Sequence, residues 1–398
     1  MNIQQLKAIV KENKSLLTVS FGLVFEGILI LASLRIAGNF VSQDDYSQLT
    51  VFYSILSILS FGLFAGLEQT RQSSKSSVFN IYSSFIYSII SILLILPLIY
   101  FIMQRLGINI KFSFFIIFYG ISYALQFEYF GYLSLIDRPK EYSQLKFLDG
   151  FMKLSLVTLT AYLGGGIETF FLAYSIAPFL ALCLFIIKTK IKFEFFSEKL
   201  QDLNSYTFLT MQNFICIFYL YGIPLVESLR NSQSTDLVSD LFFAQSFGQV
   251  LQFSLAPIQF IFLPALTKKY ISSSNLRIND VFKGTYLALL ICSAYLSLTY
   301  LFGDKIIKLL FFENFKLPVL DTISIVTVSV IILIIKTSSF YLIVTRRTKF
   351  IVIGLLSGFI LLVFAAQLTN ISTSTIFLST SIISLLSILF INVILNDD

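Results

Sequence analysis

Apolar stretches recur along the whole 398-residue chain, and this feature constrains the fold more than any other. Each stretch holds roughly 20 residues, which is long enough to cross the hydrocarbon core of a bilayer as a helix. They lie at 16–38, 49–67, 80–103, 112–135, 147–164, 169–187, 205–225, 241–266, 284–302, 318–344, 350–368 and 375–395. Charged residues make up only 13% of the chain, well below the share in soluble domains. The sequence therefore predicts an all-α polytopic membrane protein with about twelve transmembrane helices.

Lysine and arginine are distributed unevenly over the segments that connect these spans. With the N-terminus placed inside, 19 of the 28 lie on the inner side, Lys146 among them, six lie on the outer side and three lie within spans. Positive residues accumulate in the cytoplasmic loops of membrane proteins. We therefore expect both termini to lie on the cytoplasmic side.

The two halves of the chain resemble each other in how their spans end. The second and the eighth spans both end in a polar and basic segment, and Thr70 and Thr267 stand 197 positions apart in these segments. Two sets of six spans that both start inside form a parallel repeat, which is typical of transporters. We predict two six-helix bundles, formed by residues 1–195 and 196–398, around a central cavity.

Residues that usually carry chemistry are scarce. There is no His, the three Cys lie singly in apolar runs, and neither a P-loop nor a dinucleotide-binding glycine pattern occurs. We expect no catalytic activity, no metal and no cofactor. A membrane-embedded glycan polymerase or transferase is a weaker alternative, because such enzymes usually carry a large loop with clustered carboxylates, His or Arg. The longest outer segments here, 226–240 and 303–317, are short.

Four glutamines share one face of the eighth span. They are Gln245, Gln249, Gln252 and Gln259. At 100° per residue their positions fall within an arc of about 80°. Amides donate and accept hydrogen bonds without carrying charge, so this face suits a water-filled cavity or a hydroxyl-rich ligand. The alternative is hydrogen bonding between neighbouring helices. Gln212 and Asn213 in the seventh span are added to the same candidate cavity.

Four charged residues are predicted deep in the membrane, where a charge is costly unless it is paired, hydrated or neutralised. Glu26 is either a cavity carboxylate that carries a proton or a neutral carboxyl bonded to another helix. Glu128 is the second candidate proton carrier. Arg35 either extends to the outer interface or serves as a cation for an anionic substrate group. Lys336 must lose its proton or find an anion, and it is a candidate substrate contact.

Two further pairs of opposite charge are predicted to be structural. Asp149 and Lys153 stand at i and i+4 with the acid first, which is the favourable order on a helix. Glu68 and Arg71 stand at i and i+3 near the inner end of the second span.

Several passages carry a resemblance to a known family. Residues 31–38 hold an Arg followed by a small residue and Gly, 42–47 hold acidic residues before a Tyr, and 66–71 read Gly-Leu-Glu-Gln-Thr-Arg. Residues 131–142 and 311–315 add two more passages. Together they resemble the polysaccharide transporters of the O-antigen flippase (Wzx) type, in the multidrug/oligosaccharidyl-lipid/polysaccharide (MOP) superfamily. Ser47 stands where that family usually has Gly, and 311–315 lacks its Gly.

This resemblance implies two six-helix bundles in a V, with spans one, two, seven and eight lining the cavity. It also implies the substrate, an undecaprenyl-diphosphate-linked oligosaccharide moved from the cytoplasmic to the periplasmic leaflet of the bacterial inner membrane. Candidate partners are this substrate, membrane lipids and other polysaccharide-assembly membrane proteins, and no nucleic acid. The alternative within the same fold is a cation-coupled multidrug exporter, which would favour acidic and aromatic cavity groups.

Overall fold

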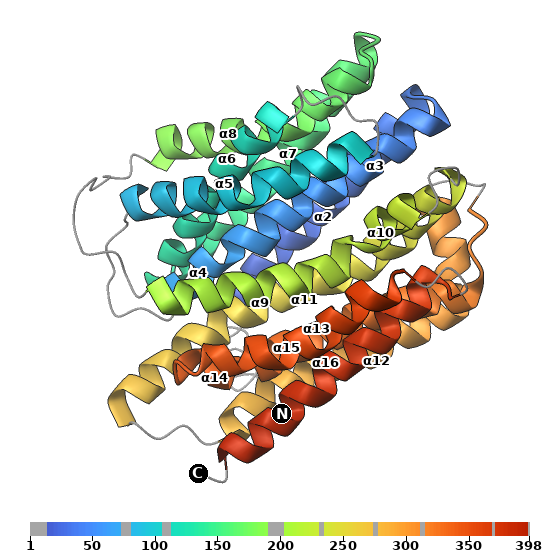
Figure 1. Ribbon diagram of the computed structural model, residues 1–398. Coiled ribbons are helices and arrows are strands. Elements are labelled where there is room, and N and C mark those ends of the chain that lie inside the picture. Colours follow the sequence, from blue (N-terminus) through green and yellow to red (C-terminus); the bar gives the residue numbers. More distant parts are fainter. Residues whose placement is uncertain are drawn as a thin grey trace, which may run out of the picture.

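The computed structural model describes residues 14–72, 81–105, 113–189, 203–230, 235–273, 278–310, 315–367 and 371–396. The regular structure of the described residues is entirely helical (Figure 1). The N-terminal half contains α2 (Lys14–Phe40), α3 (Gln43–Ser57), the π-helical segment η1 (Ile58–Phe64), α4 (Ala65–Gln72), α5 (Ile81–Arg105), α6 (Ser113–Leu135), α7 (Pro139–Tyr162) and α8 (Ile167–Thr189). The C-terminal half contains α9 (Leu203–Tyr221), α10 (Ile223–Arg230), α11 (Thr235–Ser273), α12 (Ile278–Leu310), α13 (Val319–Ser338), α14 (Phe340–Val344), α15 (Thr348–Ala365) and α16 (Thr373–Asn396).

Each of the twelve predicted spans coincides with one helix or with an interrupted one. The second span is built from α3, η1 and α4 in direct succession, and the tenth from α13 and α14. The seventh is broken at Gly222, where α9 and α10 meet at a bend of 66°. Among the described residues, six helices are long and apolar enough to cross a membrane, and the bent pair makes a seventh.

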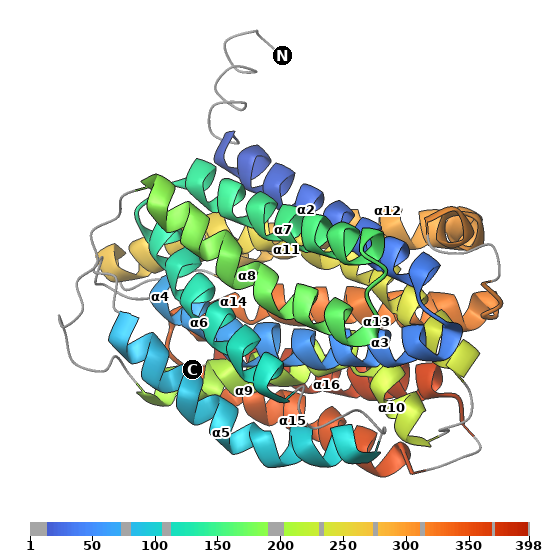
Figure 2. The same ribbon diagram turned by 90° about the horizontal axis from the view of Figure 1, so that it is seen from above.

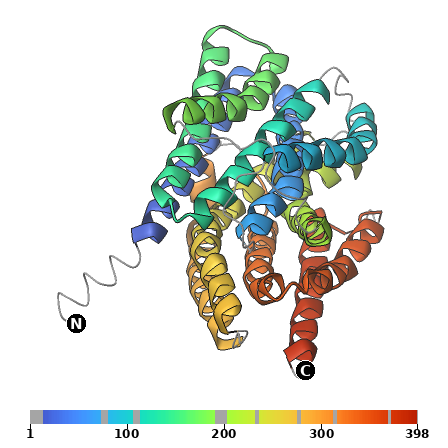
Figure 3. The same cartoon turned by 90° about the vertical axis from the view of Figure 1, so that its left-hand side faces the viewer.

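The helices form two groups that follow the order of the chain. In Figure 1 the blue-to-green helices α2–α8 lie above the yellow-to-red helices α9–α16, and the view in Figure 3 shows the same division. Five N-terminal elements, α2, α3, η1, α4 and α6, contact α9, α10 or α11 of the other group. The predicted boundary between 195 and 196 falls in 190–202, outside the described residues.

Helices α2 and α7 run side by side (Figure 2) and make the most extensive helix contact in the described part of the chain. Gly150 of α7 makes the approach possible, since a Cβ atom there would lie 2.9 Å from the Cα atom of Glu26. Small residues at such crossings let helix backbones come close in membranes. The packing therefore places Glu26 directly against α7.

The start of α7 corrects one sequence-based expectation. Helix α7 begins at Pro139, earlier than the predicted start at 147, because proline is well suited to the first helical position. Lys146 therefore lies inside the helix, and its side chain is buried at 3% exposure. The expectation that Lys146 belongs to a solvated inner loop is wrong.

Candidate functional site

A cluster of buried charges occupies the N-terminal bundle between α2, α6 and α7. Lys153 Nζ lies 2.7 Å from Asp149 Oδ2, and the Tyr123 hydroxyl donates to the same oxygen at 2.7 Å. Lys146 Nζ lies 3.6 Å from Glu26 Oε2. All five side chains are buried. The two distances show that the predicted Asp149–Lys153 pair is present and that the cation opposite Glu26 is Lys146.

Two carboxyl oxygens in this cluster lack a hydrogen-bond donor among the described residues. They are Glu26 Oε1 and Asp149 Oδ1. The two carboxyl groups lie close enough to hydrogen-bond to each other if one of them carries a proton. Buried acceptors without donors are costly. A single proton held between Glu26 and Asp149 would satisfy both.

Lys146 is surrounded by aromatic rings as well as by its carboxylate. Its Nζ lies 4.3 Å from the ring centroid of Phe130, 5.6 Å from that of Phe127 and 5.7 Å from that of Phe61. Ring faces attract a cation, most strongly where water is excluded. Phe61 belongs to η1 and stacks on Tyr221 at the break in the seventh span, with centroids 6.2 Å apart. The aromatic shell of Lys146 thus extends to the other bundle.

Glu68 lies in α4, where the two bundles meet. Its Oε1 accepts hydrogen bonds from the Tyr142 hydroxyl at 3.1 Å and from Gln72 Nε2 at 3.0 Å. Lys146 of its own bundle and Lys336 of the C-terminal bundle lie in its neighbourhood, but Glu68 forms an ion pair with neither of them. The side chain of Arg71 lies outside the described residues, so the predicted Glu68–Arg71 pair stays a prediction.

Next to Glu68, polar groups of α9 face the N-terminal bundle at the end of the molecule predicted to be cytoplasmic, here called the inner end. Asn213 Nδ2 donates to Gln69 Oε1 at 2.8 Å across the two bundles. Neither amide atom of the buried Gln212 has a hydrogen-bond partner among the described residues. Cys216, one turn after Gln212, lies in the neighbourhood of the half-buried Lys336. The inner end therefore combines a cation with an amide free to bind.

Two of the four glutamines of α11 hydrogen-bond to a helix break. Gln249 Nε2 donates to the backbone carbonyl of Leu220 at 2.8 Å, and Gln245 Nε2 donates to the same oxygen. Leu220 needs these donors because the residue four positions on is Pro224, which has no N–H. For Gln245 and Gln249 the structure therefore shows hydrogen bonding between neighbouring helices, which was the alternative interpretation of the glutamine face. The side chains of Gln252 and Gln259 lie outside the described residues, and substrate contact by the glutamine face stays a prediction.

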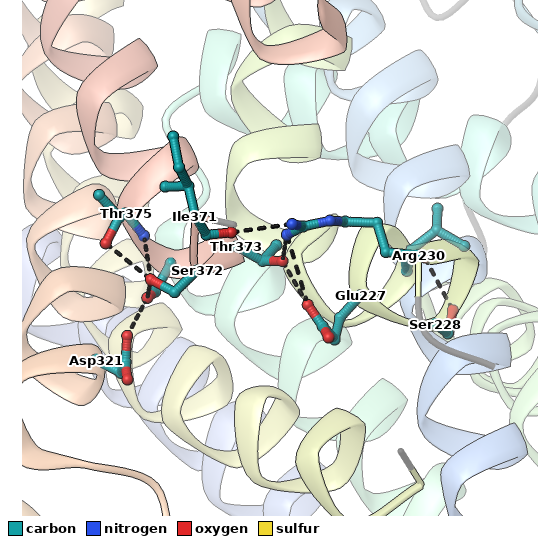
Figure 4. Close-up of polar contacts among 10 residues, drawn as sticks. Glu227, Ser228, Arg230, Asp321, Ile371, Ser372, Thr373 and Thr375 are labelled. Carbon is teal, nitrogen blue, oxygen red and sulfur yellow. Dashed lines mark hydrogen bonds and ion pairs between the residues drawn. The ribbon is translucent and has the colours of Figure 1, made fainter. Parts of the chain in front are cut away.

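The outer half of the broken span is anchored within the C-terminal bundle. Figure 4 shows Arg230 and Glu227 of α10 pointing at the segment that leads into α16. Arg230 Nη2 donates to the Ile371 carbonyl at 2.9 Å, its Nη1 lies 3.8 Å from Glu227 Oε2, and the Thr373 hydroxyl donates to Glu227. We interpret this network as structural, because both Nη atoms of Arg230 and the carboxylate of Glu227 have partners within it.

A pocket of about 430 Å³ opens between the bundles at the opposite end, here called the outer end. It is lined by Gln43 and Tyr46 of α3 and by Asp236 and Asp240 of α11, among others. Gln43 Nε2 donates to Asp236 across the bundles. Burial raises the pKa of Asp240 above its ordinary value, and the neighbouring Asp236 carboxylate adds to the increase.

Two further predicted site residues lie on α2 and α6. Arg35 is exposed on the outer part of α2, and Glu128 is buried in α6. Lys146 and Tyr123 were missed as site residues in the sequence, although Lys146, Asp149 and Lys153 stand at i, i+3 and i+7 on one helical face. That spacing would have predicted a charged face on one helix. It was missed because Lys146 was assigned to the segment before the predicted span.

Comparison with known proteins places this geometry in a recognised architecture. No protein family model matches the chain, and no curated protein matches it by sequence. Solved structures do match over almost the whole length. A eukaryotic MATE transporter superimposes with a TM-score of 0.68 at 12% identity, covering 96% of both chains. The chain has the fold of the MATE transporters.

Two further structures agree with this result. An outward-facing multidrug resistance MATE transporter of the MOP superfamily gives a TM-score of 0.64 at 11% identity, covering 95% of this chain and 93% of that one. A MOP superfamily transporter from Pyrococcus furiosus gives 0.64 at 11% identity, covering 95% and 94%. That transporter is described as having a binding pocket of reversed polarity, which suggests a different function for it. The predicted fold class, a polytopic all-α protein of this superfamily's two-bundle architecture, is confirmed.

Proposed function

We propose that the protein is a flippase that moves a lipid-linked oligosaccharide with an anionic diphosphate head from the cytoplasmic to the periplasmic leaflet of the bacterial inner membrane. The observation that carries the proposal is the buried polar region where the bundles meet, in which the amide of Gln212, unpartnered among the described residues, and the Asn213–Gln69 hydrogen bond lie between the lysine-bearing faces of the two bundles. An anionic head group that enters between the bundles would pair with Lys336, and with Lys146 once that lysine separates from Glu26.

A diphosphate cannot cross hydrocarbon unaided, because its charges would lose their hydration. Lys336, the unpaired amide of Gln212 and the Asn213–Gln69 contact lie at the inner end, where such a substrate would enter. The polyprenyl tail can remain in lipid at the gap between the bundles. Rocking of one bundle against the other then carries the head group to the opposite side.

The coupling ion in this proposal is a proton held by Glu26 and Asp149. The cluster contains two lysines, Lys146 and Lys153, opposite three carboxyl groups when Glu68 is counted. One added proton makes the set neutral, and the two oxygens without donors mark where it would bind. Uptake of this proton weakens the attraction of Glu26 for Lys146 and leaves that ammonium available for an anionic substrate.

A second candidate function is a cation-coupled multidrug exporter, since two of the structural neighbours cited are described as MATE transporters. The buried carboxyl groups of Glu26 and Asp149 favour it, because they would suit a cationic drug. Buried lysines close to both carboxylates count against it, because they would repel such a drug.

An experiment that deletes the gene and then supplies variants of Lys336 distinguishes the two candidate functions. We expect deletion to accumulate lipid-linked repeat units in the cytoplasmic leaflet, Lys336→Arg to restore export, and Lys336→Gln to leave export at least tenfold lower. Resistance to cationic drugs should not change. Normal glycan export in the deletion strain, together with hypersensitivity to cationic dyes, would establish the exporter instead.

A further inference from the structure

The pocket at the outer end differs in chemistry from the lysines deeper in the molecule. Its volume of about 430 Å³ is in the range of pockets that hold small organic ligands. Two of its lining residues, Asp236 and Asp240, are acidic, and one, Lys316, is basic. The excess of negative charge disfavours a diphosphate here, so any substrate group that fits must be neutral or cationic.

The walls of the pocket combine donors, acceptors and aromatic surface. Gln43 and Ser239 can each donate and accept hydrogen bonds, while the carboxylates of Asp236 and Asp240 accept them. Tyr46 stacks on Phe243 across the bundles with ring centroids 5.7 Å apart. A sugar presents many hydroxyl groups, each both donor and acceptor, and apolar ring faces that can lie on aromatic side chains. This is the ligand chemistry that the walls match.

We propose that this pocket binds the saccharide part of the substrate on its way to release. The identity of that saccharide as part of a lipid-linked molecule rests on the function proposed above. Both bundles contribute to the pocket, and the Gln43–Asp236 hydrogen bond spans it. Hydroxyl groups of a bound sugar would compete for these two side chains and so favour separation of the bundles at the outer end.

The test measures sugar binding without transport. Oligosaccharide released from its lipid carrier by mild acid is added to the purified full-length protein in nanodiscs, and saturation-transfer NMR reports its dissociation constant. We expect Asp240→Asn and Gln43→Leu to weaken binding at least tenfold. The control is Asp44→Asn, an exposed neighbour of Gln43 that does not line the pocket, and it should bind as the unaltered protein does. All variants must elute as single species, and none may have a thermal midpoint below that of the unaltered protein at the pH of the binding assay.

Two results would overturn the proposal: no saturation transfer with the unaltered protein, or equal binding by Asp240→Asn and Asp44→Asn. Flipping of the intact lipid-linked oligosaccharide is measured in parallel in proteoliposomes. If the sugar binds in the pocket and the lipid does not move, the proposed flippase function fails while the pocket assignment stands. If the lipid moves and the sugar does not bind, only the pocket assignment fails.

Discussion

At the scale of single residues, each buried ion in the N-terminal bundle is compensated in a different way. Lys153 has a short ion pair with Asp149 and a hydroxyl partner in Tyr123. Lys146 has a longer contact with Glu26 and is stabilised in addition by the rings of three phenylalanines. The first pair is tight and the second is loose, so the second is the one that can exchange its partner.

This difference predicts unequal effects of isosteric substitutions. Asp149→Asn removes the carboxylate that lies 2.7 Å from Lys153 Nζ, and we expect a loss of about 3–5 kcal/mol in the free energy of unfolding. Glu26→Gln should cost clearly less, because its contact with Lys146 is longer and Lys146 keeps its aromatic neighbours. Unfolding of the purified variants by SDS titration in mixed micelles measures both. Equal losses would contradict the distinction between a tight and a loose pair.

Asp240 predicts a dependence of stability on pH. Its pKa is raised by burial, so the folded state binds the proton more tightly than the unfolded state does. Its favourable contribution is therefore complete below the ordinary aspartate pKa of 3.8 and is lost as the pH rises through the raised value. Relative to the unaltered protein, Asp240→Asn should gain stability between pH 4 and pH 7, as read from thermal midpoints. A difference between the two proteins that does not change with pH would refute this.

At the scale of elements, the break in the seventh span lets α9 and α10 run in different directions and contact different helices. Pro224 removes the donor that the Leu220 carbonyl would have in a continuous helix, and Gln245 and Gln249 supply donors from α11. Beyond the break, α10 is held by Glu227 and Arg230 to the start of α16 (Figure 4). The bend is therefore fixed by side chains from two other helices.

A suppressor experiment tests this account of the bend. The double variant Gln245→Leu with Gln249→Leu leaves the buried Leu220 carbonyl without its side-chain donors, and we expect a loss of about 1–3 kcal/mol in the free energy of unfolding. Adding Pro224→Ala restores an N–H four residues after Leu220 and should recover most of that loss. If Pro224→Ala gives no recovery in the double variant, the two glutamines have another role.

The spans were predictable from sequence because the length of an apolar run is a local property, and all twelve correspond to helices. The way in which the break in the seventh span is stabilised was not predictable. It depends on the amides of α11 lying beside the Leu220 carbonyl, which is a contact between helices. Gln245 and Gln249 do bind one common oxygen from the same side of α11, but the identity of that partner depends on the neighbouring helix. Likewise Asp149 and Lys153 were paired from their spacing, whereas the contact of Glu26 with Lys146 joins two helices far apart in sequence.

At the scale of the whole molecule, contacts join the bundles at both ends. At the inner end Asn213 bonds to Gln69, and a Cβ atom on Gly66 would lie 3.1 Å from the backbone nitrogen of Thr210. At the outer end Gln43 bonds to Asp236, and Tyr46 stacks on Phe243. Alternating access requires that each set of contacts opens in turn.

Cross-linking the inner end should therefore stop transport. In a background without Cys183, Cys216 and Cys292, the pair Gln69→Cys and Asn213→Cys is joined by a short cleavable thiol cross-linker. We expect transport in proteoliposomes to fall to the level of empty vesicles and to return when the linker is cleaved. Each single cysteine variant treated in the same way is the control. Full transport by the cross-linked protein would show that the inner contacts need not separate.

The central claim is that two bundles carry an anionic lipid head group across the membrane on lysines contributed by both. Purified protein is reconstituted with a fluorescent lipid-linked oligosaccharide, and the fraction accessible to a membrane-impermeant quencher is followed over time. We predict rapid loss of the protected fraction with the unaltered protein and at least a tenfold slower loss with Lys336→Gln. A protected fraction that does not change, in vesicles that do export a cationic dye under a proton gradient, would contradict the claim.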